Sequence, residues 1–134
     1  MKKYLPILIV LVVVFSASTA VFAQPTKRIN FYKKATAATV SSSLQNYKDK
    51  KVFVIKVRRG QSLRTEQVGV PSSSHYITVS IRNPAGETVG DSDASCNNRR
   101  EIAPTATGDY TITVVQCRKA DAWRGRFKLK VEVK

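Results

Sequence analysis

The residues best suited to binding chemistry gather near the C-terminus, in the segment VVQCRKADAWRGRF (residues 114–127). Its predicted loop, from Arg118 to Arg126, carries three arginines, a lysine and the chain's one tryptophan, Trp123. A connection that only reverses the chain needs about 2–5 residues. Guanidinium groups form planar, charge-assisted hydrogen bonds with carboxylates, and a tryptophan supplies rigid contact area. The loop therefore predicts recognition of an acidic partner, and the alternative is a solvated hairpin whose charges only maintain solubility.

Side chains suited to catalysis are scarce. His75 is the one histidine, and no serine, cysteine or acid near it in the sequence suggests a triad. The segment GDSD (residues 90–93) offers carboxylates to calcium, but such a site needs about 6–8 oxygen ligands. Only 9 acidic residues stand against 23 lysines and arginines, so a solvated turn is the better interpretation. We expect no enzyme activity, no cofactor and no metal.

The first 23 residues have the organisation of a secretory signal peptide. A positive MKK start precedes an apolar run, Leu5–Phe15, and small residues lead to a cleavage site after Ala23. The apolar run is shorter than the ~20 residues of a membrane span, so we expect no span after cleavage. An uncleaved N-terminal anchor is the alternative. Residues 24–134 then form one domain, located in the periplasm or secreted.

The chain is strongly basic, which limits the kinds of partner it attracts. Loss of Lys2 and Lys3 with the signal peptide lowers the formal charge from +14 to +12. Such a charge favours an acidic protein cleft, an anionic envelope polymer or nucleic acid. Export to an extracytoplasmic compartment argues against nucleic acid.

The two cysteines, Cys96 and Cys117, are expected to form one disulfide in an oxidising compartment. Their spacing does not suit zinc. The disulfide would bring CNNRR (residues 96–100) beside the root of the basic loop, and Arg99 and Arg100 would then extend the same positive end.

Short segments of alternating apolar and polar residues recur along the remaining chain, separated by turn residues such as NPAG (residues 83–86). Strict alternation is typical of antiparallel strands with one buried face. The pattern predicts an all-β protein, a small antiparallel β-sandwich of about seven to eight strands. The candidate strands are Ile29–Tyr32, Thr39–Leu44, Lys51–Val57, residues 75–82, 109–116 and 127–134.

Two resemblances to known families follow from longer motifs. IRNPAGETV and IAPTATGDYTITVVQ are similar to the pre-peptidase C-terminal type of secreted β-sandwich. INFYKK, LQNYKDKKVFVIKVRRGQSL and PTATGDYTITVVQCR…WRGRFKLKVEVK together resemble the proteinaceous inhibitors of goose-type (g-type) lysozyme, with order and spacing that agree over most of residues 24–134. That resemblance implies a periplasmic β-sandwich without catalytic activity, which plugs the substrate cleft of a lysozyme and protects peptidoglycan.

The same resemblance implies which residues contact the lysozyme. A tyrosine before the third strand corresponds to Tyr47, and the first arginine after the V-x-Q-x-R strand end corresponds to Arg118. The second contact arginine is either Arg124 or Arg126, while Cys117 and Trp123 depart from the family pattern. Trp123 and Tyr47 would supply contact area around the arginines.

The positive charge of the protein also allows functions other than lysozyme inhibition. Lysozymes are commonly basic, so a protein of charge +12 would be repelled from them at long range. The alternative function is a non-enzymatic module that binds anionic glycan or lipopolysaccharide in the envelope. A calcium-assisted carbohydrate-binding sandwich ranks last, because acidic residues are few.

Overall fold

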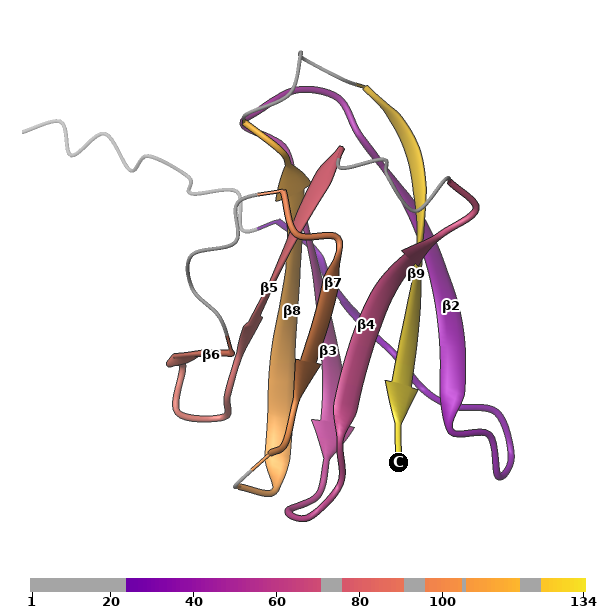
Figure 1. Ribbon diagram of the computed structural model, residues 1–134, viewed down its shortest axis with the longest axis vertical. Coiled ribbons are helices and arrows are strands. Elements are labelled where there is room, and N and C mark those ends of the chain that lie inside the picture. The colour runs from indigo at the N-terminus through magenta and orange to yellow at the C-terminus, as the bar shows by residue number, and fades with distance from the viewer. Residues whose placement is uncertain (1–23, 71–75, 91–95, 105, 119–123) are drawn as a thin grey trace, which may run out of the picture.

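The computed structural model describes residues 24–70, 76–90, 96–104, 106–118 and 124–134 (Figure 1). Four of the sequence predictions lie outside these residues. They concern the signal peptide, His75, the aspartates of GDSD and Trp123.

The described residues form nine strands and no helix, so they contain no helix able to cross a membrane. The strands are β1 (Thr26–Arg28), β2 (Ala37–Leu44), β3 (Lys50–Val57), β4 (Leu63–Val68), β5 (Ile77–Arg82), β6 (Thr88–Val89), β7 (Arg99–Ile102), β8 (Gly108–Gln116) and β9 (Gly125–Val133). One sheet has the order β1-β3-β8-β5-β6 and the other the order β2-β9-β4-β7. Figure 1 shows them as two layers, which confirms the predicted all-β sandwich.

The hydrophobic core lies between the two sheets. The alternating residues of four strands are buried, as the pattern predicts. They are Phe53, Ile55 and Val57 on β3, the alternate residues of β5 and β8, and Phe127, Leu129 and Val131 on β9. Phe53 and Phe127 meet edge-to-face, with ring centroids 6.5 Å apart and an interplanar angle of 87°. Because the two rings belong to different sheets, this contact helps to fix the sheets against each other.

Several strands differ from the prediction. The candidate strand Ile29–Tyr32 is wrong, because the ladder ends at Arg28; Ile29 is buried and its N–H donates to Val54 O at 2.8 Å. The β1–β3 pair is parallel, whereas the other pairs are antiparallel. Strands β4, β6 and β7 were not predicted. In β4 two of the three buried positions are polar, Thr65 and Gln67, so apolar alternation does not identify this strand.

The segment 96–100 connects the two sheets near one end of the sandwich. Asn97 O accepts from Val79 N on β5, and Asn98 O accepts from Gln67 N on β4, both at 2.9 Å. Arg100 is only 7% exposed, and its Nε donates to Val79 O at 2.8 Å. The segment therefore satisfies backbone groups in both sheets at once.

The predicted Cys96–Cys117 disulfide is present, with Cα atoms 4.6 Å apart. The expectation that Arg99 and Arg100 extend the positive end is wrong. Arg100 is buried, and Arg99 forms an ion pair with Glu66 on the outer face of the sheet. The cystine thus joins the end of β8 to the segment that connects the sheets.

Removal of this cross-link is expected to destabilise the fold without abolishing it. The two cysteines are 21 residues apart in the sequence. A cross-link over this separation reduces the entropy of the unfolded chain and so stabilises the folded state by about 3 kcal/mol. A Cys96→Ala/Cys117→Ala double variant should lose about this much free energy of unfolding in a urea titration. A double variant as stable as the parent would contradict a structural role for the disulfide.

Candidate functional site

Parts of two connections lie at one end of the sandwich, which we call the site end: the β2–β3 loop (residues 45–49) and the described ends of the β8–β9 connection, Cys117–Arg118 and Arg124. Strand pairing sets their proximity, because Leu44 pairs with Gly125 and Lys50 pairs with Val115. Figure 1 shows the β2–β3 loop, the end of β8 and the start of β9 at the same end of the molecule, at the top of the view. Tyr47 thus lies in one connection, while Arg118 and Arg124 begin and end the other.

The β2–β3 loop is held by its own polar side chains. Asn46 Oδ1 accepts from the N–H groups of Lys48 and Asp49, at 2.9 and 3.1 Å, which is an Asx turn. Asp49 Oδ2 accepts from Gln45 N at 3.0 Å and so closes the loop at its base. Tyr47 stands at the tip and is 36% exposed. A short, internally bonded loop of this kind presents an aromatic ring with little loss of chain entropy on binding.

Asp49 is ionised in this arrangement. Partial burial alone would raise its pKa, but hydrogen bonds from Lys51 Nζ (3.0 Å) and Gln45 N favour the carboxylate. The pKa of Asp49 therefore lies below the ordinary aspartate value. The sequence offered a signal for this organisation, since NYKD places an asparagine and an aspartate where a turn uses them. The sequence did not lead us to predict that Gln45, Asn46 and Asp49 position Tyr47.

Arg118 follows a firmly anchored strand end. Gln116 and Cys117 are buried, the latter being 2% exposed, and Cys117 N donates to Tyr76 O at 2.9 Å. The disulfide to Cys96 adds a covalent attachment at the same place. Arg118 itself is exposed. The arginine therefore projects from a fixed root, which limits the directions available to its guanidinium.

The other two arginines occupy different structural positions. Arg124 is exposed and precedes β9, whereas Arg126 lies within β9, opposite Ser43 of β2. The basic loop is thus shorter than predicted, because the strand begins at Gly125. An open depression joins the two connections; it is lined by Ser42, Ser43, Gln45, Arg124, Gly125 and Arg126.

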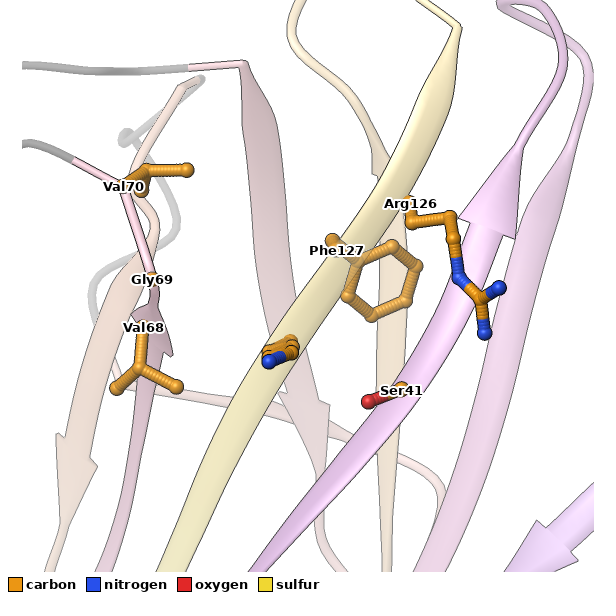
Figure 2. A pocket seen from close by; sticks show the side chains of 7 residues that line it. Ser41, Val68, Gly69, Val70, Arg126 and Phe127 are labelled. Carbon is orange, nitrogen blue, oxygen red and sulfur yellow. The ribbon is translucent and has the colours of Figure 1, made fainter.

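A second pocket, of about 240 Å³, lies on the same sheet and includes Arg126 and Phe127 in its lining. Figure 2 shows Arg126 reaching from β9 toward β2, with Ser41 below it and Val68, Gly69 and Val70 on the other side of β9. Arg126 therefore belongs to the outer face of the sheet rather than to the exposed turn at the end.

Charge on that outer face changes along the strands. Away from the site end, Lys130, Glu66 and Arg99 lie in one cross-strand row, and hydrogen bonding from Arg99 lowers the pKa of Glu66. Toward the site end, the rows Ser43–Arg126 and Ser41–Lys128–Val68 contain no acidic residue. The described cations of this sheet face therefore lack an acidic neighbour in their rows beside the depression that contains Arg124.

A possible metal centre is absent from the part of the chain that the structure describes. No group of three or more histidine, cysteine, aspartate or glutamate residues that could hold a metal occurs among the described residues. The site end therefore presents the hydrogen-bonded loop that carries Tyr47, together with Arg118 and Arg124 at the ends of paired strands.

Comparison with solved structures identifies proteins of the same fold. The chain is similar to PliG of Aeromonas hydrophila, described as a periplasmic lysozyme inhibitor of g-type lysozyme, with 23% identity, a TM-score of 0.62, and coverage of 81% of this chain and 96% of PliG. It is similar to PliG of Salmonella Typhimurium, described in the same words, with 18% identity, a TM-score of 0.60, and coverage of 84% and 100%.

The pre-peptidase C-terminal domain of collagenase from Bacillus anthracis has 14% identity, a TM-score of 0.51, and coverage of 84% of this chain and 97% of that domain. These likenesses agree with both family resemblances of the sequence motifs, and at such identities they show a shared fold. No protein-family model and no curated protein sequence matches the chain.

The Asp49 contacts predict a pH-dependent contribution to stability. Because the pKa of Asp49 is lowered in the folded state, its contribution is complete above the unfolded value, about 4, and is lost as pH falls through the folded value. Asp49→Asn should lower the free energy of unfolding by about 1 kcal/mol at pH 7. Urea titrations at several pH values should show this difference shrinking below about pH 4. A difference that stays constant down to pH 2 would exclude the carboxylate as its source.

Proposed function

We propose that the protein is a periplasmic or secreted inhibitor of g-type lysozyme, and that it binds by inserting the site end into the substrate cleft of the enzyme. The observation that carries this proposal is the meeting of the Tyr47 loop with Arg118 and Arg124 at one end of the sandwich. The shared fold with two PliG proteins, described as inhibitors of g-type lysozyme, supports the same function.

The chemistry of the cleft explains why arginine serves this purpose. A glycosidase that cleaves peptidoglycan holds a carboxylic acid in its cleft to protonate the leaving oxygen. A guanidinium that reaches such a group forms charge-assisted hydrogen bonds, which are strong where water is excluded. Arg118 is the best placed of the arginines for this contact, because the preceding residue, Cys117, is held by the disulfide and by a backbone hydrogen bond.

Of the two other arginines, Arg124 suits the inhibitory contact better. It lies at the end of the sandwich beside Gln45, whereas Arg126 lies within β9 on the outer face of the sheet. We therefore assign the second contact to Arg124 and give Arg126 a place at the rim. Trp123 directly precedes Arg124 in the sequence and is proposed to add apolar contact area to the interface.

Inhibition of this kind needs no catalytic step. The protein occupies the cleft and excludes the glycan strand. Its affinity then depends on a few fully desolvated contacts rather than on the area covered.

A second candidate function, binding of an anionic envelope polymer, has one observation in its favour. The acid-free rows that contain Arg126 and Lys128 continue from the site end along the outer face of the sheet. Charges of this kind attract a flexible polyanion through long-range forces, which salt screens.

Substitution of Arg118 distinguishes the two functions. If Arg118 meets a carboxylate in a desolvated cleft, Arg118→Ala should weaken inhibition of g-type lysozyme by about 2–5 kcal/mol, because it leaves a buried acid unpaired. Arg118→Lys should also inhibit poorly, since an ammonium lacks the planar fork. Lys130→Ala is the matched control and should change the inhibition constant little, because Lys130 lies on the outer sheet face away from the site end.

The measurement is an inhibition titration against goose-, chicken- and invertebrate-type lysozymes at low and high salt. Inhibition confined to the goose type, with a large loss only at Arg118, agrees with the proposal. Equal losses at Arg118 and Lys130 together with strong salt sensitivity would favour the polyanion-binding function instead.

A further inference from the structure

The opposite end of the sandwich carries a second group of cations, with a highly exposed aromatic ring among them. Two turns form it: residues 32–35, which precede β2, and residues 58–61, which connect β3 to β4. We call Tyr32, Lys33, Lys34, Arg58 and Arg59 the basic end. Figure 1 shows these turns at the bottom of the view, beside the C-terminus and far from the site end.

The first turn is closed by a hydrogen bond and holds Lys34 in an energetically unfavourable backbone conformation. Ala35 N donates to Tyr32 O at 2.7 Å, so Lys33 and Lys34 occupy the two central positions. Lys34 has φ 58°, in the left-handed region, where a lysine is less stable than a glycine. Tyr32 is 81% exposed. Local strain at an exposed cation, beside an exposed aromatic ring, is of the kind found at binding sites.

The second turn is fixed by hydrogen bonds from several directions. Gln61 N donates to Arg58 O at 3.1 Å, and Gln61 Oε1 accepts from Arg58 N at 2.8 Å. Arg59 N donates to Thr107 Oγ1 at 3.0 Å. The two arginines therefore project from an ordered tip.

The two turns lie side by side. One pocket of about 260 Å³ is lined by Ala35 of the first turn, by Phe31 just before it, by Arg58 and Gln61 of the second turn, and by Val133 of β9. The positive charges of both turns therefore add together at one part of the protein surface.

Acidic residues near this end are already engaged. Asp109 accepts two hydrogen bonds from Arg28, at 3.0 and 2.6 Å, and Glu132 lies 2.7 Å from Lys134 Nζ. Hydrogen bonding from these partners lowers the pKa of both carboxyls, so both stay ionised and each is paired with its own cation, Arg28 or Lys134. No ion pair within the described part of the chain includes Lys33, Lys34, Arg58 or Arg59. The four cations of the basic end are therefore outside the ion pairs that the described residues form.

We propose that the basic end docks on a phosphate-bearing lipid surface. The cations converge on two adjacent turns at a tip, which suits a plane of headgroups; a linear polyanion is better matched by cations spread along a strand face. A tyrosine ring is suited to the headgroup level of a membrane, with its apolar body down and its hydroxyl in water. Because each cation near an anionic membrane adds about 1 kcal/mol, four of them support reversible association.

This docking would leave the site end directed away from the membrane. The inference does not depend on lysozyme binding, because it uses other residues at the other end of the molecule. An inhibitor held at a lipid surface would meet its target where peptidoglycan is exposed to attack.

The test is sedimentation of the exported protein with vesicles of phosphatidylglycerol and phosphatidylethanolamine, with phosphatidylcholine vesicles for comparison. A Lys33→Gln/Arg59→Gln double variant should bind the anionic vesicles about 30-fold more weakly, from roughly fivefold per cation. The matched control, Lys128→Gln/Lys130→Gln, removes the same charge from the outer face of the β2-β9-β4-β7 sheet and should change binding only a few-fold.

Lys34→Gly separates binding from folding. It removes one cation and the left-handed lysine together, so vesicle affinity should fall about fivefold while the thermal midpoint stays the same or rises. Equal binding to neutral and anionic vesicles, or equal losses in the two double variants, would overturn the proposal. So would tighter binding to soluble dextran sulfate that persists in the Lys33→Gln/Arg59→Gln variant, since the ligand would then be a polyanion held elsewhere.

Discussion

The arrangement of this molecule depends on the segment 96–100, where one short stretch of backbone serves both sheets. Asn97 and Asn98 accept hydrogen bonds from β5 and β4, the buried Arg100 side chain reaches the β5 backbone, and Cys96 is bonded to Cys117. A β-sandwich is held mainly by its apolar core, which lets its ends fray. Here polar and covalent contacts hold one end together, and that end is the one that presents Tyr47 and Arg118.

The distribution of charge divides the molecule into regions with different uses. On the outer face of the β2-β9-β4-β7 sheet, Glu66 and Glu132 neutralise nearby cations. The cations outside the ion pairs include Arg126 and Lys128, which lie on this sheet face near the site end, and the four cations of the basic end, which lie in turns. Under the two proposals made above, the site end would meet a carboxylate in an enzyme cleft and the basic end would meet headgroup phosphates.

The sequence predicts those parts of the fold that depend on apolar alternation. Strands β3, β5, β8 and β9 are predicted because Phe53, Ile81, Tyr110 and Phe127 stand at regular inward positions. Strands β4 and β7 are missed because their inward positions include Thr65, Gln67 and Arg100. The disulfide follows from compartment and cysteine count, but the burial of Arg100 depends on a tertiary contact with Val79 O. Local spacing cannot reveal such a contact, nor can it reveal that Arg126 belongs to a strand.

The central claim is that the site end enters the lysozyme cleft. The most direct measurement is amide hydrogen exchange of the protein alone and in complex with a goose-type lysozyme. The account predicts new protection in residues 45–49 and around Arg118 and Arg124, with exchange unchanged at the turns 32–35 and 58–61. Protection confined to the outer sheet faces or to the basic end, in a complex that still inhibits the enzyme, would contradict it.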